Sequence, residues 1–285
     1  MRFPVLLFFC SFVAIAKGQV FEGVVVNSIT NEPLPYSNVG ILNKNVGTVT
    51  DDNGAFKLDV SKMSPTDTIR ISYIGYETID ILGLNADSEK AIIRLKPREF
   101  QLPEVQIVNR KSKTFIEGNT VKWDRITYGY MSEQLGAEFG TLIKLNKPAL
   151  LGEIRFHIVK TTLDSLVLRV NVYDVVNGMP CNNLLKEPII IRPTNVAGDV
   201  SIDLSEYNIV LEDDFVICLE NFKKLGNNIS GIKISAGMFN DLSYQRLGSQ
   251  GKWNKIRFKK INVGVGLNVK MIASKSRAKT IKKVG

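Results

Sequence analysis

A short acidic stretch is the part of this sequence that most resembles a site for chemistry. In GTVTDDNGAFKLDV, residues 47–60, Asp51, Asp52 and Asn53 stand directly before Gly54, as oxygen ligands crowd a calcium loop. An EF-hand loop also needs a glycine at its sixth position and a glutamate at its twelfth, and counting from either aspartate satisfies neither requirement. We therefore predict a hairpin turn, in which Asp and Asn side chains bind their own backbone and Gly54 adopts a positive φ.

Catalysis that depends on histidine is restricted by the presence of a single one, His157. A zinc peptidase site of the His₂Glu type needs two histidines and a glutamate, and a Ser-His-Asp triad would have to use this same residue. In EIRFHIV the apolar side chains Ile154, Phe156 and Ile158 alternate with it, so we expect His157 on the outer surface of a strand. No G-x-S-x-G motif accompanies it.

The remaining motifs for chemistry are weak. Asp213 and Asp214 are adjacent carboxylates, but they directly precede the apolar run FVICLE, where a turn is expected. The glycines of GVGLNV lie within an alternating strand and open no helix, so they are no dinucleotide fingerprint. The sequence has no P-loop and no Cys-x-x-Cys motif. We predict a protein that is no enzyme and that uses no cofactor and no metal.

Exposed aromatic side chains are the candidates for ligand binding. The segments KWDRITYGY and GKWNKIRF mix aromatic with basic residues, which suits an acidic glycan or a peptidoglycan strand. The alternative is that these rings fill the core or cover the edges of a sandwich. The candidate ligand-binding residues are Trp123, Tyr128, Tyr130, Tyr244 and Trp253.

The N-terminus has the pattern of a secretory signal peptide at residues 1–18. A short positive start is followed by the apolar run FPVLLFFCSFVAIA and by small residues before Gln19. A retained membrane anchor is the alternative. Removal of residues 1–18 deletes Arg2 and Lys17 and lowers the formal net charge from +9 to +7. We expect an exported protein of the periplasm or of the cell envelope and outer membrane.

The rest of the chain reads as two all-β domains. Residues 19–97 contain short apolar runs separated by turns rich in Asn, Pro, Gly and Asp, which predicts a small β-sandwich. Residues 98–120 read as a polar linker with one embedded strand, EVQIV. Residues 121–274 hold about eight alternating strands, which favours a jelly-roll-like two-sheet sandwich. Residues 275–285 form a basic tail.

Two of these strands show the alternation clearly. In SLVLRVNVYDV, the aliphatic residues share one face, and Arg169, Asn171 and Tyr173 share the other, the period of a half-buried strand. In DDFVICLENF, Cys218 lies on the face opposite Phe215 and Leu219. The second cysteine of the mature chain, Cys181, lies in a loop, and the spacing does not decide between a disulfide and two unpaired residues.

The first domain also resembles a known family. Four marks carry the resemblance: an opening strand with Gly23 and Val25, the turn NEPLP, the segment GTVTDDNGAF and the strand SYIGY. They are similar to the carboxypeptidase regulatory-like domain, which implies a transthyretin-like (prealbumin-like) β-sandwich. The second region resembles, more weakly, the sandwich that follows this module in envelope proteins of Gram-negative bacteria. The same module precedes TonB-dependent outer-membrane receptors, and LPEVQIV is similar to the segment that links the two.

These observations predict an interaction or binding module with an unidentified envelope partner. A carbohydrate-binding sandwich is the first alternative, and an accessory domain of an outer-membrane uptake system is the second. Nucleic acid is not expected as a partner because the basic residues are scattered along the chain. Membrane contact is expected to be peripheral at most, through lysines of the basic tail.

Overall fold

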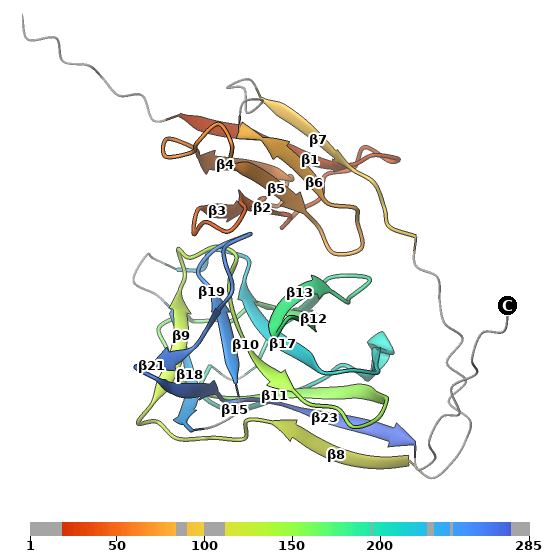
Figure 1. Ribbon diagram of the computed structural model, residues 1–285, viewed down its shortest axis with the longest axis vertical. Coiled ribbons are helices and arrows are strands. Elements are labelled where there is room, and N and C mark those ends of the chain that lie inside the picture. The colour runs from red at the N-terminus through yellow and green to blue at the C-terminus, as the bar shows by residue number, and fades with distance from the viewer. Residues whose placement is uncertain are drawn as a thin grey trace, which may run out of the picture.

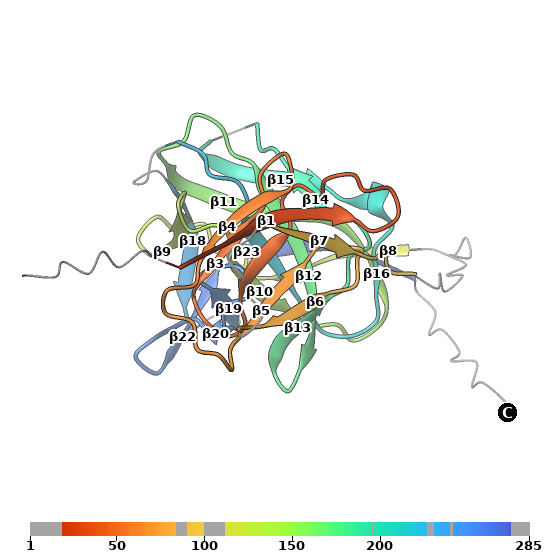
Figure 2. The same ribbon diagram turned by 90° about the horizontal axis from the view of Figure 1, so that it is seen from above.

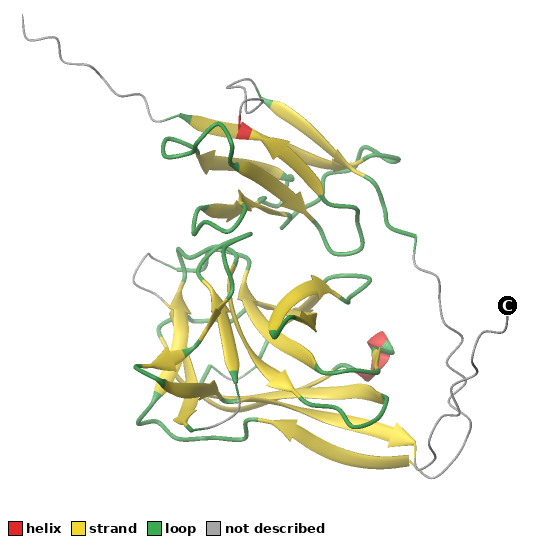
Figure 3. Cartoon of the chain, viewed as in Figure 1, coloured by secondary structure: helices red, strands yellow, loops and turns green. Residues whose placement is uncertain are grey.

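The computed structural model describes residues 19–83, 90–99, 112–194, 196–226, 231–239 and 242–274. The predicted leader, the predicted strand at 104–108 and the basic tail lie outside these ranges. In the described part of the chain the regular structure is β, apart from 3₁₀ turns such as η2 (Ser205–Tyr207) (Figure 3). No helix within these residues is long and apolar enough to cross a membrane. The prediction of an all-β fold is confirmed.

The N-terminal domain is a sandwich of two small sheets. One sheet has the order β4-β1-β7, with β1 antiparallel to β4 and parallel to β7, and the other has the order β3-β2-β5-β6. Buried apolar residues from both sheets, among them Phe21, Val39 and Ile69, form one core. The strands are β1 (Val20–Asn27), β2 (Asn38–Ile41), β3 (Gly47–Val49), β4 (Ala55–Asp59), β5 (Thr68–Ser72), β6 (Ile79–Leu82) and β7 (Ala91–Leu95).

The acidic stretch at 51–54 forms the predicted turn, but the turn does not close a hairpin. The Asp51 carboxylate accepts hydrogen bonds from the backbone N–H groups of Asn53 (2.9 Å) and Ala55 (2.8 Å). Gly54 has φ +72°, and a Cβ there would lie 2.6 Å from the Val25 carbonyl oxygen. The strands on either side pair in different sheets, β3 with β2 and β4 with β1. The turn therefore carries the chain from one sheet of the sandwich to the other.

The second domain is a larger two-sheet sandwich. Its 7-stranded sheet has the order β13-β12-β17-β10-β19-β20 with β14 beside β12, and its 9-stranded sheet is built along β21-β22-β18-β11-β23-β8. The strands are β8 (Ser112–Gly118), β9 (Thr127–Met131), β10 (Ala137–Ile143), β11 (Ala149–Thr161), β12 (Leu168–Val176), β13 (Met179–Asn183), β14 (Ile189–Ile191), β15 (Gly198–Asp203), β16 (Val210–Leu211), β17 (Phe215–Asn221), β18 (Gly231–Met238), β19 (Ser243–Arg246), β20 (Asn254–Lys255), β21 (Arg257–Phe258), β22 (Ile261–Val265) and β23 (Leu267–Ser274).

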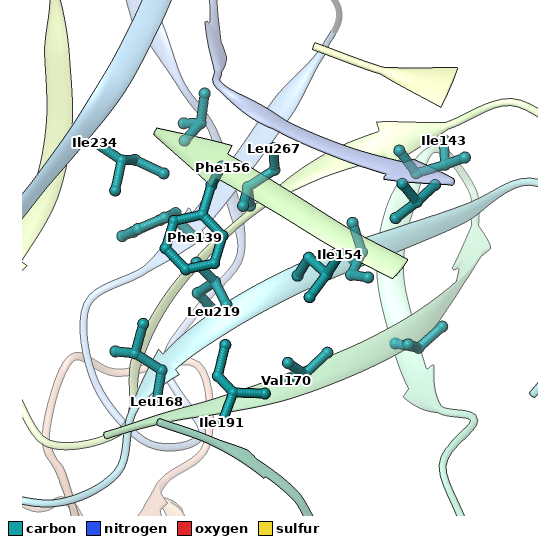
Figure 4. Close-up of a cluster of buried hydrophobic side chains, with 14 of the residues drawn as sticks. Phe139, Ile143, Ile154, Phe156, Leu168, Val170, Ile191, Leu219, Ile234 and Leu267 are labelled. Carbon is teal, nitrogen blue, oxygen red and sulfur yellow. The ribbon is translucent and has the colours of Figure 1, made fainter. Parts of the chain in front are cut away.

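The core of this domain lies between its two sheets. Phe139, Val170 and Leu219 from the 7-stranded sheet meet Phe156 and Leu267 from the 9-stranded sheet (Figure 4). The inward residues of β12 and β17 are those that the alternation predicted. Burial of so much aliphatic surface, at about 25 cal/mol per Å², is the main force that holds the sandwich together.

Two boundaries differ from the prediction. The segment 98–120 is not all linker, because β8 pairs along its whole length with β23 at the edge of the 9-stranded sheet. Its side chains are mostly exposed, so its apolar pattern is weak. The alternating run that contains GVGLNV is not one strand either. It divides at Gly266, where a Cβ would lie 2.7 Å from the Val121 carbonyl oxygen, so that β22 pairs with β18 whereas β23 pairs with β11.

The two sandwiches are packed against each other, with β2 and β3 of the first on the side that faces β19 of the second (Figure 1). The backbones approach closely, since a Cβ on Gly40 or Gly47 would lie 2.1 or 2.3 Å from the Ser249 carbonyl oxygen. The Asn43 N–H donates to the Gln250 carbonyl (2.9 Å). Glycine is required at these positions because no side chain fits between the two domains.

Candidate interdomain binding site

The outer face of the 7-stranded sheet carries charged residues that are buried. Strands β10, β12, β17 and β19 contribute one ionised group each: Glu138, Arg169, Glu220 and Arg246. None of the four is more than 8% exposed. Ionised groups at such depth are stable only when they are paired and hydrogen-bonded. The arrangement of their partners therefore defines this part of the molecule.

Arg169 and Glu220 form a bidentate ion pair on adjacent strands. Arg169 Nε donates to Glu220 Oε2 (2.7 Å) and Nη2 donates to Oε1 (2.5 Å), and the two residues are cross-strand partners in the register of β12 and β17. The Asn171 amide donates a third hydrogen bond to Glu220 Oε2 (2.6 Å). The planar guanidinium matches the carboxylate geometry, so both charges are satisfied without water.

The N-terminal domain completes this network through Tyr36. Its carbonyl accepts a hydrogen bond from Arg169 Nη1 (2.7 Å), and its ring meets Phe222 edge-on at 4.8 Å between centroids. Tyr36 has φ +63°, a left-handed conformation that is costly for a bulky residue. The strained backbone therefore occurs where one domain supplies an acceptor to a buried cation of the other.

Asn38 makes a second polar connection between the domains. With its amide nitrogen toward Glu220, it donates to Glu220 Oε1 (3.0 Å) and to Ser249 Oγ (2.6 Å) and accepts from Arg169 Nη2 (2.9 Å). Nearby, Gln250 Nε2 donates to Ser72 Oγ (2.7 Å). Each contact joins a residue of the first sandwich to one of the second.

Arg246 and Glu138 form the second buried pair. Arg246 Nε donates to Glu138 Oε1 (2.9 Å), Nη2 donates to the same oxygen, and Nη2 also donates to the Tyr173 hydroxyl (3.0 Å). The Arg246 guanidinium lies 5.0 Å from the centroid of the Trp253 ring, a cation–π contact. The other carboxylate oxygen of Glu138, Oε2, is buried and has no hydrogen-bond partner within the described residues.

The two glutamates respond differently to burial. Desolvation raises the pKa of Glu138 to about 7, because Arg246 only partly compensates for the lost water. Burial acts in the same direction on Glu220, but the charge and hydrogen bonds of Arg169 outweigh it and lower the pKa of this carboxyl. The difference follows the geometry, since Glu220 is bonded on both oxygens and Glu138 on one.

A third ion pair lies at the exposed edge of the interface. Lys223 donates to the Tyr36 hydroxyl (2.9 Å) and to the Asp52 carboxylate (3.2 Å). The Tyr36 hydroxyl also binds Asp52, and these hydrogen bonds, that of Tyr36 first, lower the pKa of the Asp52 carboxyl. Asp52, one of the suspected calcium ligands, therefore serves as an interdomain contact.

A cleft of about 170 Å³ lies between the two sandwiches beside this network. The N-terminal domain lines it with residues of β5, the turn after it and the segment near Pro97, and the second domain lines it from β12, β13 and β19. Its lining includes three guanidinium groups and no carboxylate among the described residues. The lining residues that carry polar groups include Asn38, Arg70, Ser72, Tyr73, Tyr76, Arg98, Tyr173, Cys181, Asn182, Asn183, Arg246 and Gln250.

The three arginines of the cleft differ in whether a carboxylate pairs with them. Arg70 is held by both oxygens of Asp80 (2.8 and 2.7 Å), and Arg246 is held by Glu138. Arg98 donates one long hydrogen bond, to the Tyr76 carbonyl (3.4 Å), and no carboxylate pairs with it within the described residues. Its guanidinium is available for a carboxylate or phosphate, which it can bind bidentately. The cleft can therefore hold an anionic group between polar amides and the Tyr73 and Tyr76 rings.

The five aromatic residues predicted to bind a ligand do not form one platform. Tyr130 and Tyr244 are buried, and Tyr128 packs edge-on against Phe139 in the core. Trp253 is half-buried against Arg246, while Trp123 is 62% exposed and stands apart from the others. Tyr130 offers no open face to a ligand because it belongs to the core between the two sheets, and Tyr244 offers none because it is buried on the outer face of the 7-stranded sheet beside Tyr173 and Cys218.

The other candidates for chemistry have structural partners. His157 Nδ1 lies 2.7 Å from Asp199 Oδ1 on the surface of the sheet, where the alternation placed it. Asp214 accepts a hydrogen bond from the Leu145 N–H (2.8 Å), which fits the predicted turn. Cys181 is exposed, Cys218 is buried, and both are free thiols. Among the described residues no cluster of three metal-ligating side chains occurs.

The sequence interpretation missed the residues of the buried network. The alternation places Arg169, Asn171 and Tyr173 on the correct face of β12, but the period of a half-buried strand does not predict that this face is covered as well. One sequence feature does indicate the buried network. Glu138, Arg169 and Glu220 each lie within an apolar run, and these runs form adjacent strands of one sheet. Complementary charges within such runs are expected to pair when the sheet is covered on both faces.

Comparisons with known proteins support the first domain. Residues 21–107 match the CarboxypepD_reg-like domain family. No curated protein matches the chain. Among solved structures, the cysteine protease and lectin-like domains of Cwp84 from Clostridium difficile are 12% identical with a TM-score of 0.39, covering 84% of this chain and 59% of that chain. A structure of infectious bursal disease virus, Gt strain, is 9% identical with a TM-score of 0.25, covering 89% of this chain and 62% of that one. The chain thus spans less than two thirds of either structure, and neither likeness bears on function.

Proposed function

We propose that this protein is a non-enzymatic, exported component of the cell envelope that acts as an interaction module. Its recognition site is the cleft between the two sandwiches. The observation that carries this proposal is the Arg98 guanidinium, which lines the cleft and has no carboxylate partner among the described residues, whereas Arg70 and Arg246 are already paired. The signal-peptide pattern at residues 1–18 and the CarboxypepD_reg-like domain at 21–107 support export and a binding role.

The packing of the two domains suits a site that is built from both. The domains meet through hydrogen bonds from the buried Arg169–Glu220 pair to Tyr36 and Asn38 and through close backbone contacts, so the two walls of the cleft are held at a fixed separation. A preorganised site loses less conformational entropy when it binds. The ligand is a segment or group that carries a carboxylate or phosphate, and Arg98 is its principal contact.

Affinity capture from a detergent extract of cell envelopes tests the proposal. Immobilised protein should retain one defined envelope protein, and recovery should fall for Arg98→Ala and for Thr78→Trp, which fills the cleft at an exposed lining residue. Ile92→Trp is the matched control, because Ile92 is exposed but does not line the cleft. Equal recovery by all variants would contradict the cleft as the site.

Two further measurements separate the alternatives. A glycan array with acidic oligosaccharides should give no signal that depends on Trp123, whereas a signal lost in Trp123→Ala would favour the carbohydrate-binding alternative. Hydrolysis of a peptide or glycoside by the purified protein, abolished by substitution of one carboxylate, would contradict the non-enzymatic role.

A further inference from the structure

Two exposed phenylalanines lie on either side of β22 in the second sandwich. Phe239 follows β18 and is 81% exposed, and Phe258 ends β21 and is 57% exposed. Both are tied to β22, since the Phe239 N–H donates to the Asn262 carbonyl (3.1 Å) and Phe258 pairs with Ile261. The β21–β22 hairpin projects from the body of the protein (Figure 2). We call Phe239, Phe258 and the residues 252–260 the aromatic tip.

The backbone of the aromatic tip adopts conformations that side chains usually avoid. Phe239 has φ +63°, and Lys259, in the turn after Phe258, has φ +57°. Left-handed backbone is uncommon for residues with a Cβ and is a clear outlier for a bulky aromatic ring. Packing in the core does not account for the conformation of Phe239, because that ring is largely in solvent. Strain that brings an apolar ring outward points to a use at the surface.

The aromatic tip is also strongly basic. The nine residues KWNKIRFKK contain Lys252, Lys255, Arg257, Lys259 and Lys260, and the sequence has no acidic residue from 242 to its end. In the described part of the chain none of these five basic groups lies within 4.0 Å of a carboxylate. Exposed apolar rings in a segment with unpaired cations, of which Lys259 lies 6.0 Å from the centroid of the Phe258 ring, complement a surface that has an apolar interior and anionic headgroups.

We propose that the aromatic tip docks the protein on an anionic phospholipid bilayer. Phe239 and Phe258 enter the interfacial region of the membrane, and the five basic side chains contact phosphate headgroups. Aromatic rings are favoured at this depth, and each Lys or Arg near an anionic surface adds to the binding. Phe239 and Phe258 do not line the interdomain cleft, and their role does not depend on the ligand of the cleft.

Flotation of the full-length protein with lipid vesicles tests this inference. We expect the protein to float with vesicles of phosphatidylcholine that contain about one third phosphatidylglycerol, less so at high salt, and not with pure phosphatidylcholine. The pair Phe239→Asn and Phe258→Ser should lower the partition coefficient at least about tenfold, since two buried rings are lost. The pair Lys259→Gln and Lys260→Gln should lower it about tenfold.

Matched controls distinguish the aromatic tip from other surfaces. Leu82→Ser with Ile92→Ser removes two exposed apolar side chains from the first sandwich and should leave flotation unchanged. Lipids brominated in their acyl chains should quench the added fluorescence of Phe258→Trp and not that of Leu82→Trp. The proposal is overturned if anionic vesicles do not bind the protein. It is also overturned if the aromatic-tip variants float like the unaltered protein while glutamine replacements in 275–285 abolish binding.

Discussion

The two faces of the 7-stranded sheet are both buried, but they are stabilised in different ways. On β17, Phe215, Ile217 and Leu219 enter the apolar core, whereas the alternate residues Cys218 and Glu220 belong to the outer face. The stability contributed by the apolar face depends on the area and volume of its side chains. The loss of free energy of unfolding on substitution is therefore proportional to the number of buried atoms removed. The charged face depends on complete pairing, because one missing partner leaves a desolvated charge. Position within a sheet therefore does not by itself determine the cost of a substitution.

Arg169→Met should have the largest effect. The substitution keeps most of the side-chain volume but leaves the Glu220 carboxylate buried without its cation. Breaking a buried ion pair in this way costs about 3–5 kcal/mol. Urea unfolding followed by circular dichroism measures the loss.

A second substitution shows whether the charge or the volume is responsible. Arg169→Met combined with Glu220→Met removes both charges and should recover most of the lost stability. A double variant that is as unstable as Arg169→Met would contradict the view that pairing governs this face.

Leu219→Ala, on the opposite face and in the same strand, should cost about 2–5 kcal/mol through lost burial and the cavity left behind. The same urea titration measures it. In contrast to Arg169→Met, no single substitution at a cross-strand partner such as Val170 should restore the stability. If a polar residue at position 170 restored the stability of Leu219→Ala, the apolar face would depend on pairing in the same way as the charged face.

Glu138 should make stability depend on pH. Its pKa is raised to about 7 in the folded protein, so the fold holds this proton more tightly than the unfolded chain does. The resulting stabilisation is complete below the pKa of an unfolded glutamate and is lost as the pH rises toward 7. This stabilisation is on the order of 1–3 kcal/mol.

Unfolding titrations at a series of pH values, with Glu138→Gln as the comparison, check this prediction. The substituted protein should lose the decline between about pH 5 and pH 7. Glu220 affects stability in a different pH range. Because its pKa is lowered in the folded protein, its contribution to stability is lost as the pH falls below the pKa of an ordinary glutamate and through the lowered pKa of Glu220. An identical pH profile for both proteins would remove Glu138 as the cause.

Lys223→Gln should have the smallest effect. It breaks the contact with Asp52 at the rim of the interface, where water screens both charges. The free energy of unfolding should stay within the error of the urea titration, at low salt as well as at high salt. A large loss would mean that rim contacts, rather than the hydrogen bonds of Tyr36 and Asn38 to the buried Arg169–Glu220 pair, hold the domains together.

Local chemistry was the part of the fold that could be predicted from the sequence. The Asp51 and Gly54 turn was predicted because its hydrogen bonds and its positive φ depend on neighbouring residues alone. The pairing of β3 and β4 in separate sheets was not predicted, since a turn does not specify the partners of its strands. Alternation likewise placed Arg169 on the correct face, but it carries no information on what covers that face. The buried charged network and the cleft beside it could not be predicted for this reason.

The buried charged face joins the two sandwiches into one unit, and scanning calorimetry of the full-length protein tests this role most directly. The unaltered protein should show one cooperative transition, with equal calorimetric and van't Hoff enthalpies. Arg169→Met should separate it into two transitions, one for each domain. Two independent transitions in the unaltered protein, or a single transition that Arg169→Met merely shifts, would contradict the account.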